Sequence, residues 1–308
     1  MPKIEEGLKL DFHNVLIRPK RSTINSRSNV NLMRNIKFKN CKSLKMWEGI
    51  PIIASNMDTV GTFEVYKTLS KFKIITALHK FYDVTDFLSF QSDNNIILNP
   101  DLFMVSTGIQ EIDFDRLKKI LSVIDCNWIW EDIANGYIQS LVHFCRRIRE
   151  EYPDKIIVAG NVVTREIVEE LILNGGVDVV KVGIGPGSAC LTRMKTGVGM
   201  PQLSAIMECA DAAHGVGGHI IGDGGITCPG DMAKAFGGGA DFVMVGGAFS
   251  GHDENPGETI VNPDGSKSKL FYGMSSSHAM NKHYGGMNDY RASEGRIVRV
   301  PYRGPLED

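Results

Sequence analysis

Short apolar runs alternate with longer amphipathic stretches along most of the chain. The apolar runs are rich in β-branched residues and end in glycine or polar residues, as buried strands do. Eight such runs predict strands over 51–55, 74–77, 103–106, 127–131, 155–159, 178–182, 219–222 and 241–245. The amphipathic stretches predict helices, for example over 63–72, 113–124, 138–152, 164–176, 202–215 and 229–239. This alternation predicts an α/β fold, most economically a single (β/α)8 TIM barrel. A doubly wound open sheet is the alternative, but it needs a reversal point that the sequence does not reveal.

Polar residues and glycines follow seven of the eight predicted strands. In a barrel the carboxyl ends of all strands face one mouth, where the active site lies. Glycine pairs follow the last two strands, at Gly224 and Gly225 and at Gly246 and Gly247. Such pairs let backbone N–H groups approach a phosphate. The sequence therefore predicts a phosphate monoester or a nucleotide as the ligand.

Composition narrows the class of protein. The 308 residues carry a formal net charge of −2, which argues against nucleic-acid or anionic-membrane binding through bulk charge. The first residues are charged and lack the apolar core of a signal peptide, and no apolar run reaches the length of a membrane span. The six cysteines form no C-x-x-C pair, so we expect reduced thiols and a cytoplasmic protein. We expect one domain over 1–308, with an N-terminal extension and a flap at about 250–295.

One cysteine has unusual neighbours. Seven of the twenty residues from 183 to 202 are glycine or proline, and Cys190 lies among them. Flexible backbone on both sides would let the sulfur move toward a substrate, as a nucleophile requires. A free cysteine is otherwise most often a small buried apolar residue. The residues alone leave both interpretations of Cys190 open.

The motif GIGPGSACLTR, with SNMDTVG upstream and DGG, GG, GMSS and RASEG downstream, resembles the family of IMP dehydrogenase and GMP reductase. The resemblance runs from about residue 8 to residue 304. It implies that Cys190 attacks C2 of a purine nucleotide and forms a covalent thioimidate, with Thr192 and Glu294 as the proton-transfer pair.

Three features favour the reductase branch of this family. The stretch 74–101 leaves no room for the CBS regulatory domain usual in the dehydrogenases, FYGMSSSHAM replaces their RGMGS, and 251–269 lacks their adjacent Arg-Tyr pair. The implied reaction is NADPH-dependent reductive deamination of GMP to IMP and ammonia. A dehydrogenase without the regulatory domain and a non-catalytic phosphate-binding barrel are the alternatives.

The resemblance also implies ligand contacts. Those to the nucleotide are Ser188, Asp223, Gly224, Gly225, Gly246, Gly247, Gly273, Met274, Ser275, Arg291, Ala292, Ser293 and Gly295. Those to NADPH are Ser26, Arg27, Lys80, Asp132, Ile133, Ala134, Ile184, Gly185, Met274, Tyr290 and Arg291. Potassium would lie among Gly185, Gly187, Cys190 and Arg193. The family further implies a homotetramer, and a tail beyond the equivalent of Asp308 that we expect to be missing or disordered here.

Overall fold

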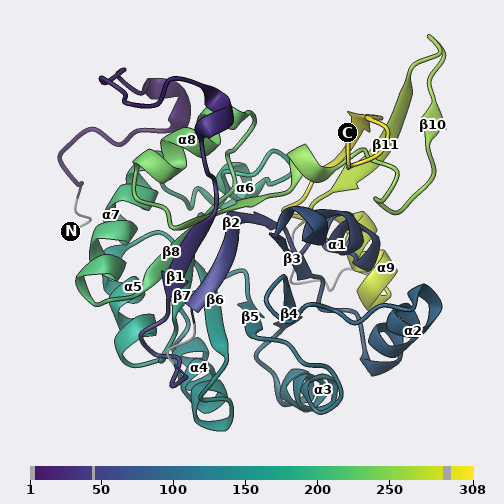
Figure 1. The fold of residues 1–308 in the computed structure, drawn as a ribbon, viewed down its shortest axis with the longest axis horizontal. Helices are drawn as coiled ribbons and strands as arrows, with labels where there is room; N and C mark the ends of the chain where they lie inside the picture. The colour runs from purple at the N-terminus through teal and green to yellow at the C-terminus, as the bar shows by residue number, and fades with distance from the viewer. Residues whose placement is uncertain (1–3, 44–45, 287–292) are drawn as a thin grey trace.

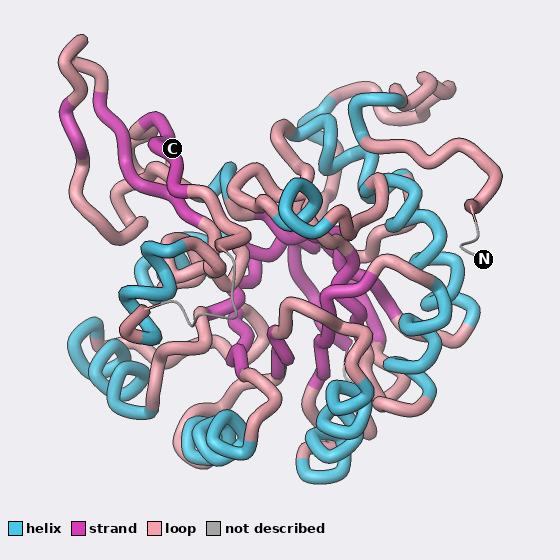
Figure 2. Tube along the Cα trace, turned by 180° about the vertical axis from the view of Figure 1, so that it is seen from behind, coloured by secondary structure: helices cyan, strands magenta, loops and turns pink. Residues whose placement is uncertain are grey.

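A computed structural model of the chain describes residues 4–43, 46–286 and 293–308. Its centre is a closed barrel of eight parallel strands (Figures 1 and 2). The barrel strands are β2 (Met46–Ala54), β3 (Ile74–Leu78), β4 (Phe103–Thr107), β5 (Trp128–Asp132), β6 (Ile156–Val162), β7 (Val179–Val182), β8 (His219–Asp223) and β9 (Phe242–Val245). Each pairs with the next in chain order, and β9 pairs back onto β2, which closes the barrel. All eight predicted strands and the barrel are confirmed.

Helices lie outside the barrel and cover it. They are α1 (Phe63–Leu69), α2 (Val84–Asn94), α3 (Glu111–Leu121), α4 (Gln139–Glu151), α5 (Arg165–Leu173), α6 (Thr192–Thr196), α7 (Gln202–Gly215) and α8 (Pro229–Gly237). Apart from the short α6, which has no buried residue, their apolar faces are buried; in α4 these positions include Leu141, Phe144 and Ile148. Local signals start several of them: the Asp83 carboxylate accepts two backbone N–H bonds at the start of α2, and Pro229 opens α8. None of the helices in the described ranges is long and apolar enough to cross a membrane.

Aromatic side chains fill the amino-terminal end of the barrel. The short strand β1 (Arg34–Lys37) pairs antiparallel with β2 and brings in Phe38. The rings of Phe38, Trp47, Trp128 and Phe242 are fully buried and meet mostly edge to face, with centroids 5.1–6.1 Å apart. Such pairs add to the stability gained from burial alone. This end of the barrel is thus a packed core.

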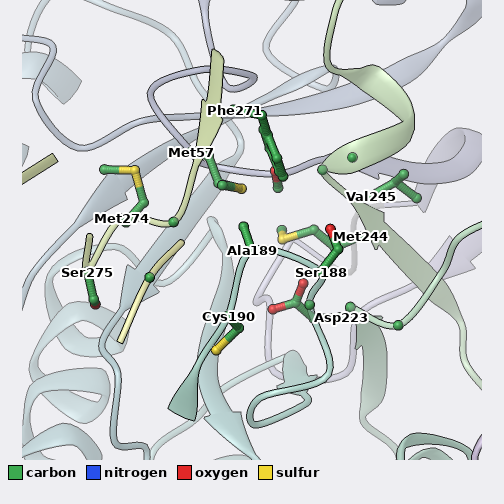
Figure 3. Close-up of a pocket in the computed structure, with 18 of the residues that line it drawn as sticks. Met57, Ser188, Ala189, Cys190, Asp223, Met244, Val245, Phe271, Met274 and Ser275 are labelled. Atoms are coloured by element: carbon green, nitrogen blue, oxygen red, sulfur yellow. The ribbon is translucent and has the colours of Figure 1, made fainter. Parts of the chain in front are cut away.

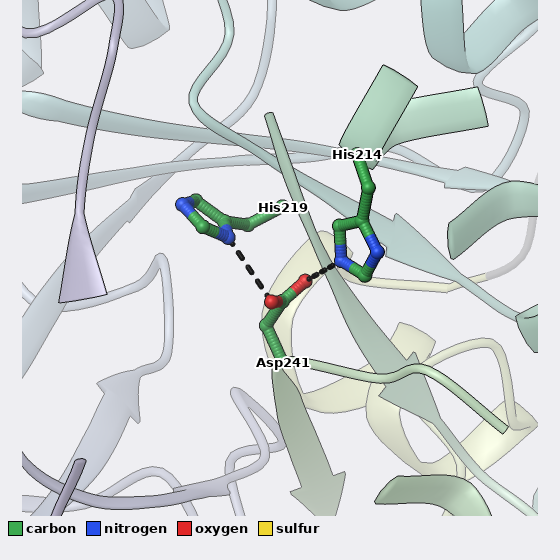
Figure 4. Close-up of side chains that lie close together, drawn as sticks. All are labelled: His214, His219 and Asp241. Atoms are coloured by element: carbon green, nitrogen blue, oxygen red, sulfur yellow. Dashed lines mark hydrogen bonds and ion pairs between the residues drawn. The ribbon is translucent and has the colours of Figure 1, made fainter. Parts of the chain in front are cut away.

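A carboxylate lies between two histidines at the same end of the barrel, and one of these histidines contacts β1 (Figure 4). Asp241, just before β9, lies 2.9 Å from Nε2 of His214 and 3.1 Å from Nδ1 of His219. His219 Nε2 lies 2.8 Å from the carbonyl of Lys37, so both of its ring nitrogens face oxygen atoms. Burial would raise the pKa of Asp241, but the two histidines outweigh it and lower the pKa to about 2. The bond to Asp241 raises the pKa of His214, and in His219 it outweighs the opposite effect of burial.

A second buried carboxyl group lies on the outer face of β5, under α4. Glu131 is fully buried, and the Cys145 thiol donates a hydrogen bond to its Oε2 at 2.8 Å. Its Oε1 has no hydrogen-bond partner among the described residues. Burial raises the pKa of Glu131 to about 8, so this side chain is mainly protonated at neutral pH.

A small antiparallel sheet follows the last barrel strand, in the region where we expect a flap. Strands β10 (Ile260–Val261), β11 (Lys267–Tyr272) and β12 (Ile297–Pro301) form an antiparallel sheet whose hairpin projects from the barrel (Figures 1 and 2). Helix α9 (Ser277–Tyr284) lies beside it. At the other end of the chain, the extension before β1 exposes several large apolar side chains, among them Ile4, Leu8 and Leu16.

Candidate active site

Two adjoining cavities lie at the carboxyl ends of the barrel strands. Their volumes are about 230 and 910 Å³. The smaller is walled by the ends of β8 and β9 and by the loop after β7, and the larger by the loops after β3, β4 and β5 and by α9. Five residues line both cavities: Cys190, Thr192, Met274, Ser275 and Glu294. Figure 3 shows the smaller cavity with Cys190 at its edge.

The three predicted catalytic residues form one hydrogen-bonded series. The Cys190 thiol donates to the Thr192 hydroxyl at 3.3 Å, and that hydroxyl donates to Oε2 of Glu294 at 2.6 Å. Cys190 is half-buried, as is Glu294. The arrangement gives a proton a direct route between the sulfur and the carboxylate, at the place where the two cavities meet.

Backbone pairing brings these distant residues together. Leu191 donates its N–H to the carbonyl of Glu294 at 2.7 Å, and Arg296 donates to Ala189 at 2.8 Å, so the two segments lie antiparallel. A Cβ at Gly295 would come within 2.6 Å of the Ser276 nitrogen. Glycine at 295 therefore permits the close approach that carries Glu294 to the thiol.

Glycines also shape the smaller cavity. Gly224 has a φ of +87°, and a Cβ there would lie 2.9 Å from the ring of Pro186. A Cβ at Gly246 would lie 3.0 Å from Oγ of Ser55. The predicted nucleotide residues that line this cavity are Ser188, Asp223, Gly224, Gly225, Gly246, Gly247, Gly273, Met274, Ser275 and Gly295. Ser293 lies next to it, with Oγ 3.4 Å from the Ser275 carbonyl, and Arg291 and Ala292 fall outside the described residues.

Asp223 is held in place by two donors from neighbouring strands. Its Oδ2 accepts from the Asn161 amide at 2.8 Å and from Nζ of Lys181 at 2.7 Å. Lys181 is buried inside the barrel with its ammonium group 4.6 Å from the centre of the Trp130 ring. Both donors bond to one oxygen of a carboxylate that lines the cavity, so Oδ1 keeps its lone pairs for a further donor.

Most of the residues predicted to bind the cofactor line the larger cavity. They are Lys80, Asp132, Ile133, Ala134, Ile184, Gly185 and Met274. Lys80 Nζ lies 3.9 Å from Oδ2 of Asp132. Ser26 and Arg27 are exposed and line neither cavity of the described chain, and Tyr290 falls outside the described residues.

Sequence reasoning missed several lining residues. In the smaller cavity they are Ser55, Met57, Ala189, Ile226, Met244, Val245 and Phe271. In the larger they include Phe81, Arg116 and His283. Ser55 and Met57 directly follow a predicted strand and carried a usable signal. Arg116 and His283 lie on helices, where their residue types indicate only solvent exposure.

The four residues predicted to bind potassium lie in the loop after β7 and at the start of α6. Gly185 has a φ of +79°, and the Arg193 guanidinium donates to the carbonyl of Ile184 at 3.2 Å. The carbonyls of Gly187 and Arg193 accept backbone bonds from Cys190 and Gly197, and each keeps a second lone pair for a cation. Potassium binding by these residues stays a prediction.

Comparisons with a family model and with known proteins agree on one family. Residues 9–308 match the model of the IMP dehydrogenase / GMP reductase domain. A GMP reductase of Aeromonas hydrophila is 58% identical over 99% of this chain and 87% of its own length. GMP reductase 2 of Mus musculus is 56% identical over 100% of this chain and 87% of its own length. A GMP reductase of Photobacterium profundum is 56% identical over 99% of this chain and 87% of its own length.

Proposed function

The chain belongs to the IMP dehydrogenase / GMP reductase family, and from this premise we propose that it is a GMP reductase that converts GMP to IMP and ammonia with NADPH. One observation carries the proposal: Cys190, Thr192 and Glu294 form a hydrogen-bonded series at the junction of the two cavities. A nucleotide in the smaller cavity and a dinucleotide in the larger one would meet at this sulfur.

In the first half of the reaction, sulfur replaces the amino group of GMP. Cys190 Sγ bonds to C2 of the guanine while the thiol proton moves through the Thr192 hydroxyl to Glu294. Glu294 then gives that proton to the departing amino group, the C2–N bond breaks, and ammonia leaves a thioimidate on Cys190. An amine leaves poorly unless it is protonated, so the acid lowers the barrier of this step.

In the second half, hydrogen replaces sulfur at C2. NADPH, when bound in the larger cavity, supplies the hydride for this exchange. The C2–S bond breaks, the sulfur takes up a proton that enters from solvent through Glu294 and Thr192, and IMP is released. Met274 and Ser275, which line both cavities, hold the two ligands next to each other.

The same proposal assigns the binding residues. Asp223, fixed by Asn161 and Lys181, takes the ribose hydroxyls, while Ser188 and the N–H groups near Gly247 take the phosphate. We also propose that the residues predicted to bind NADPH and potassium bind these two ligands. The exposed apolar side chains of the N-terminal extension support a homotetramer, and the six free cysteines support a cytoplasmic location.

The assay follows the absorbance of the reduced nicotinamide when the protein is mixed with GMP and NADPH. Loss of signal supports the reductase. Activity only with IMP and NAD would assign the chain to the dehydrogenases, and no activity with either pair would favour a phosphate-binding scaffold.

Variants test the roles in the proposed series. Cys190→Ala removes the covalent route and abolishes turnover, whereas Cys228→Ala, at an exposed cysteine outside both cavities, leaves turnover unchanged. Glu294→Gln slows turnover by about 10²–10⁴ while GMP still binds. Near-normal turnover of Cys190→Ala would refute the mechanism.

A further inference from the structure

A buried carboxylate with three donors lies directly behind the two cavities. Asp58 follows β2, its side chain is 1% exposed, and it lines neither cavity. Its Oδ2 accepts from the Tyr272 hydroxyl at 2.9 Å, from Lys282 Nζ at 2.9 Å and from His283 Nε2 at 2.6 Å. One oxygen atom thus joins three side chains to the barrel.

All three donors belong to the segment that follows the barrel. Tyr272 ends β11, and Lys282 and His283 lie near the end of α9. Between them in sequence is Met274, whose Sδ lies 3.3 Å from the backbone nitrogen of Asp58. Asp58 therefore contacts this segment at its start, in its middle and near its end.

The segment held in this way forms part of both cavity walls. Met274 lines both cavities, and His283 lines the larger one. The His283 ring stacks on Phe81, a residue of the loop after β3 that lines the same cavity, with centroids 3.6 Å apart and planes 1° apart. A shift of α9 would move Met274 and His283 together.

Charge makes the attachment strong. Burial alone would raise the pKa of Asp58, but hydrogen bonds from Lys282 and His283 outweigh it and lower the pKa. The carboxylate is therefore ionised at neutral pH and makes charge-assisted bonds. Oδ1 is buried and has no partner among the described residues, so the attachment depends on Oδ2.

We propose that Asp58 is a positioning residue, which fixes residues 272–283 so that Met274 and Ser275 stay between the nucleotide and the dinucleotide. This inference rests on the proposed function for its kinetic consequence. Its structural part, that Asp58 holds α9 to the barrel, does not depend on any activity.

The kinetic test compares Asp58→Asn with Asp178→Asn. Asp178 is equally buried and paired with Arg149, but it lies before β7, at the opposite end of the barrel. Asp58→Asn keeps the shape of the side chain and loses the charge. We expect its KM for NADPH to rise at least about tenfold, the factor that corresponds to one charge-assisted hydrogen bond. Asp178→Asn is expected to lower stability and leave the KM unchanged. Equal KM values for Asp58→Asn and the wild type would overturn the proposal.

A milder variant tests the same contact with a smaller change to the folded protein. Tyr272→Phe removes one donor and retains the ring, so we expect a smaller rise in the KM for NADPH in a fully folded protein. If Tyr272→Phe and Asp58→Asn are combined, the effects should be less than additive, because both remove the same contact. Full additivity would contradict a shared contact.

Hydrogen exchange separates the two proposals. In the unliganded chain, amides of 277–284 should exchange faster in Asp58→Asn than in the wild type or Asp178→Asn. Unchanged exchange would refute the role of Asp58 even if the chain reduces GMP. Faster exchange in a chain without reductase activity would keep that role and reject the proposed function.

Discussion

Replacing Glu131 by glutamine should change how the stability of the barrel depends on pH. The pKa of this fully buried carboxyl group is raised from 4.5 to about 8 by burial. Between these two values the folded state holds a proton that the unfolded state has lost. Stability therefore falls as pH rises through this window, and it levels off above the folded pKa. Glutamine has no proton to lose, so the variant lacks this slope.

The magnitude follows from the size of the shift. One pKa unit corresponds to about 1.4 kcal/mol, and the slope is smaller close to either pKa. Between about pH 5 and pH 8 the wild type should therefore lose about 3.5 kcal/mol relative to Glu131→Gln. The glutamine amide does not titrate, so any effect of its own hydrogen bonding on stability is the same at every pH. The difference between the two proteins should thus grow with pH in favour of the variant, whatever its starting value.

Urea denaturation of both proteins at several pH values and constant ionic strength measures this difference. The other titrating groups are common to both proteins and cancel in the comparison. Parallel stability profiles over this range would refute the reasoning, because they would mean that Glu131 ionises in the folded barrel as easily as in the unfolded chain.

Two further predictions concern buried charges elsewhere in the barrel. The pKa values of His214 and His219 are raised by Asp241, so the stability they add is present below about pH 6.5 and is lost as pH rises through their folded pKa values. Asp241→Asn should therefore lower the free energy of unfolding by about 2 kcal/mol near pH 6 and by less near pH 9. Thermal unfolding at the two pH values measures this difference. An equal loss of stability at both pH values would contradict the pairing. Lys181→Met leaves Asp223 without its cation, so unfolding should become easier by about 3 kcal/mol in urea titrations, and GMP should bind more weakly in calorimetry.

Periodicity made the barrel predictable. Each of its eight strands is a short apolar run bounded by turn residues, and both faces of such a strand are buried. Strand β1 escaped prediction because its residues are largely exposed and polar, so no apolar pattern marks it. Helix α9 also escaped prediction, because it lies in a polar stretch and owes its position to contacts with Asp58 and Phe81.

The sequence predicted those residues of the site that lie in recognisable motifs. Cys190, Thr192 and Glu294 were predicted together from their motifs, and the structure brings them within hydrogen-bond distance, while their catalytic roles stay a prediction. Lys181 lies outside these motifs, and the motif SNMDTVG contains Asp58 without showing what its carboxylate contacts. Their importance comes from contacts with residues far away in the sequence, and a single sequence does not reveal such contacts.

The antiparallel pairing at Gly295 brings together side chains that are synthesised far apart in time. Glu294 comes 102 residues after Thr192, beyond the last barrel strand. A nascent polypeptide that has passed β9 has all eight strands of the barrel and its cysteine, but not yet the acid. Translation therefore delivers the two ends of the hydrogen-bonded series at different times, and the series can form only after all eight barrel strands have been synthesised.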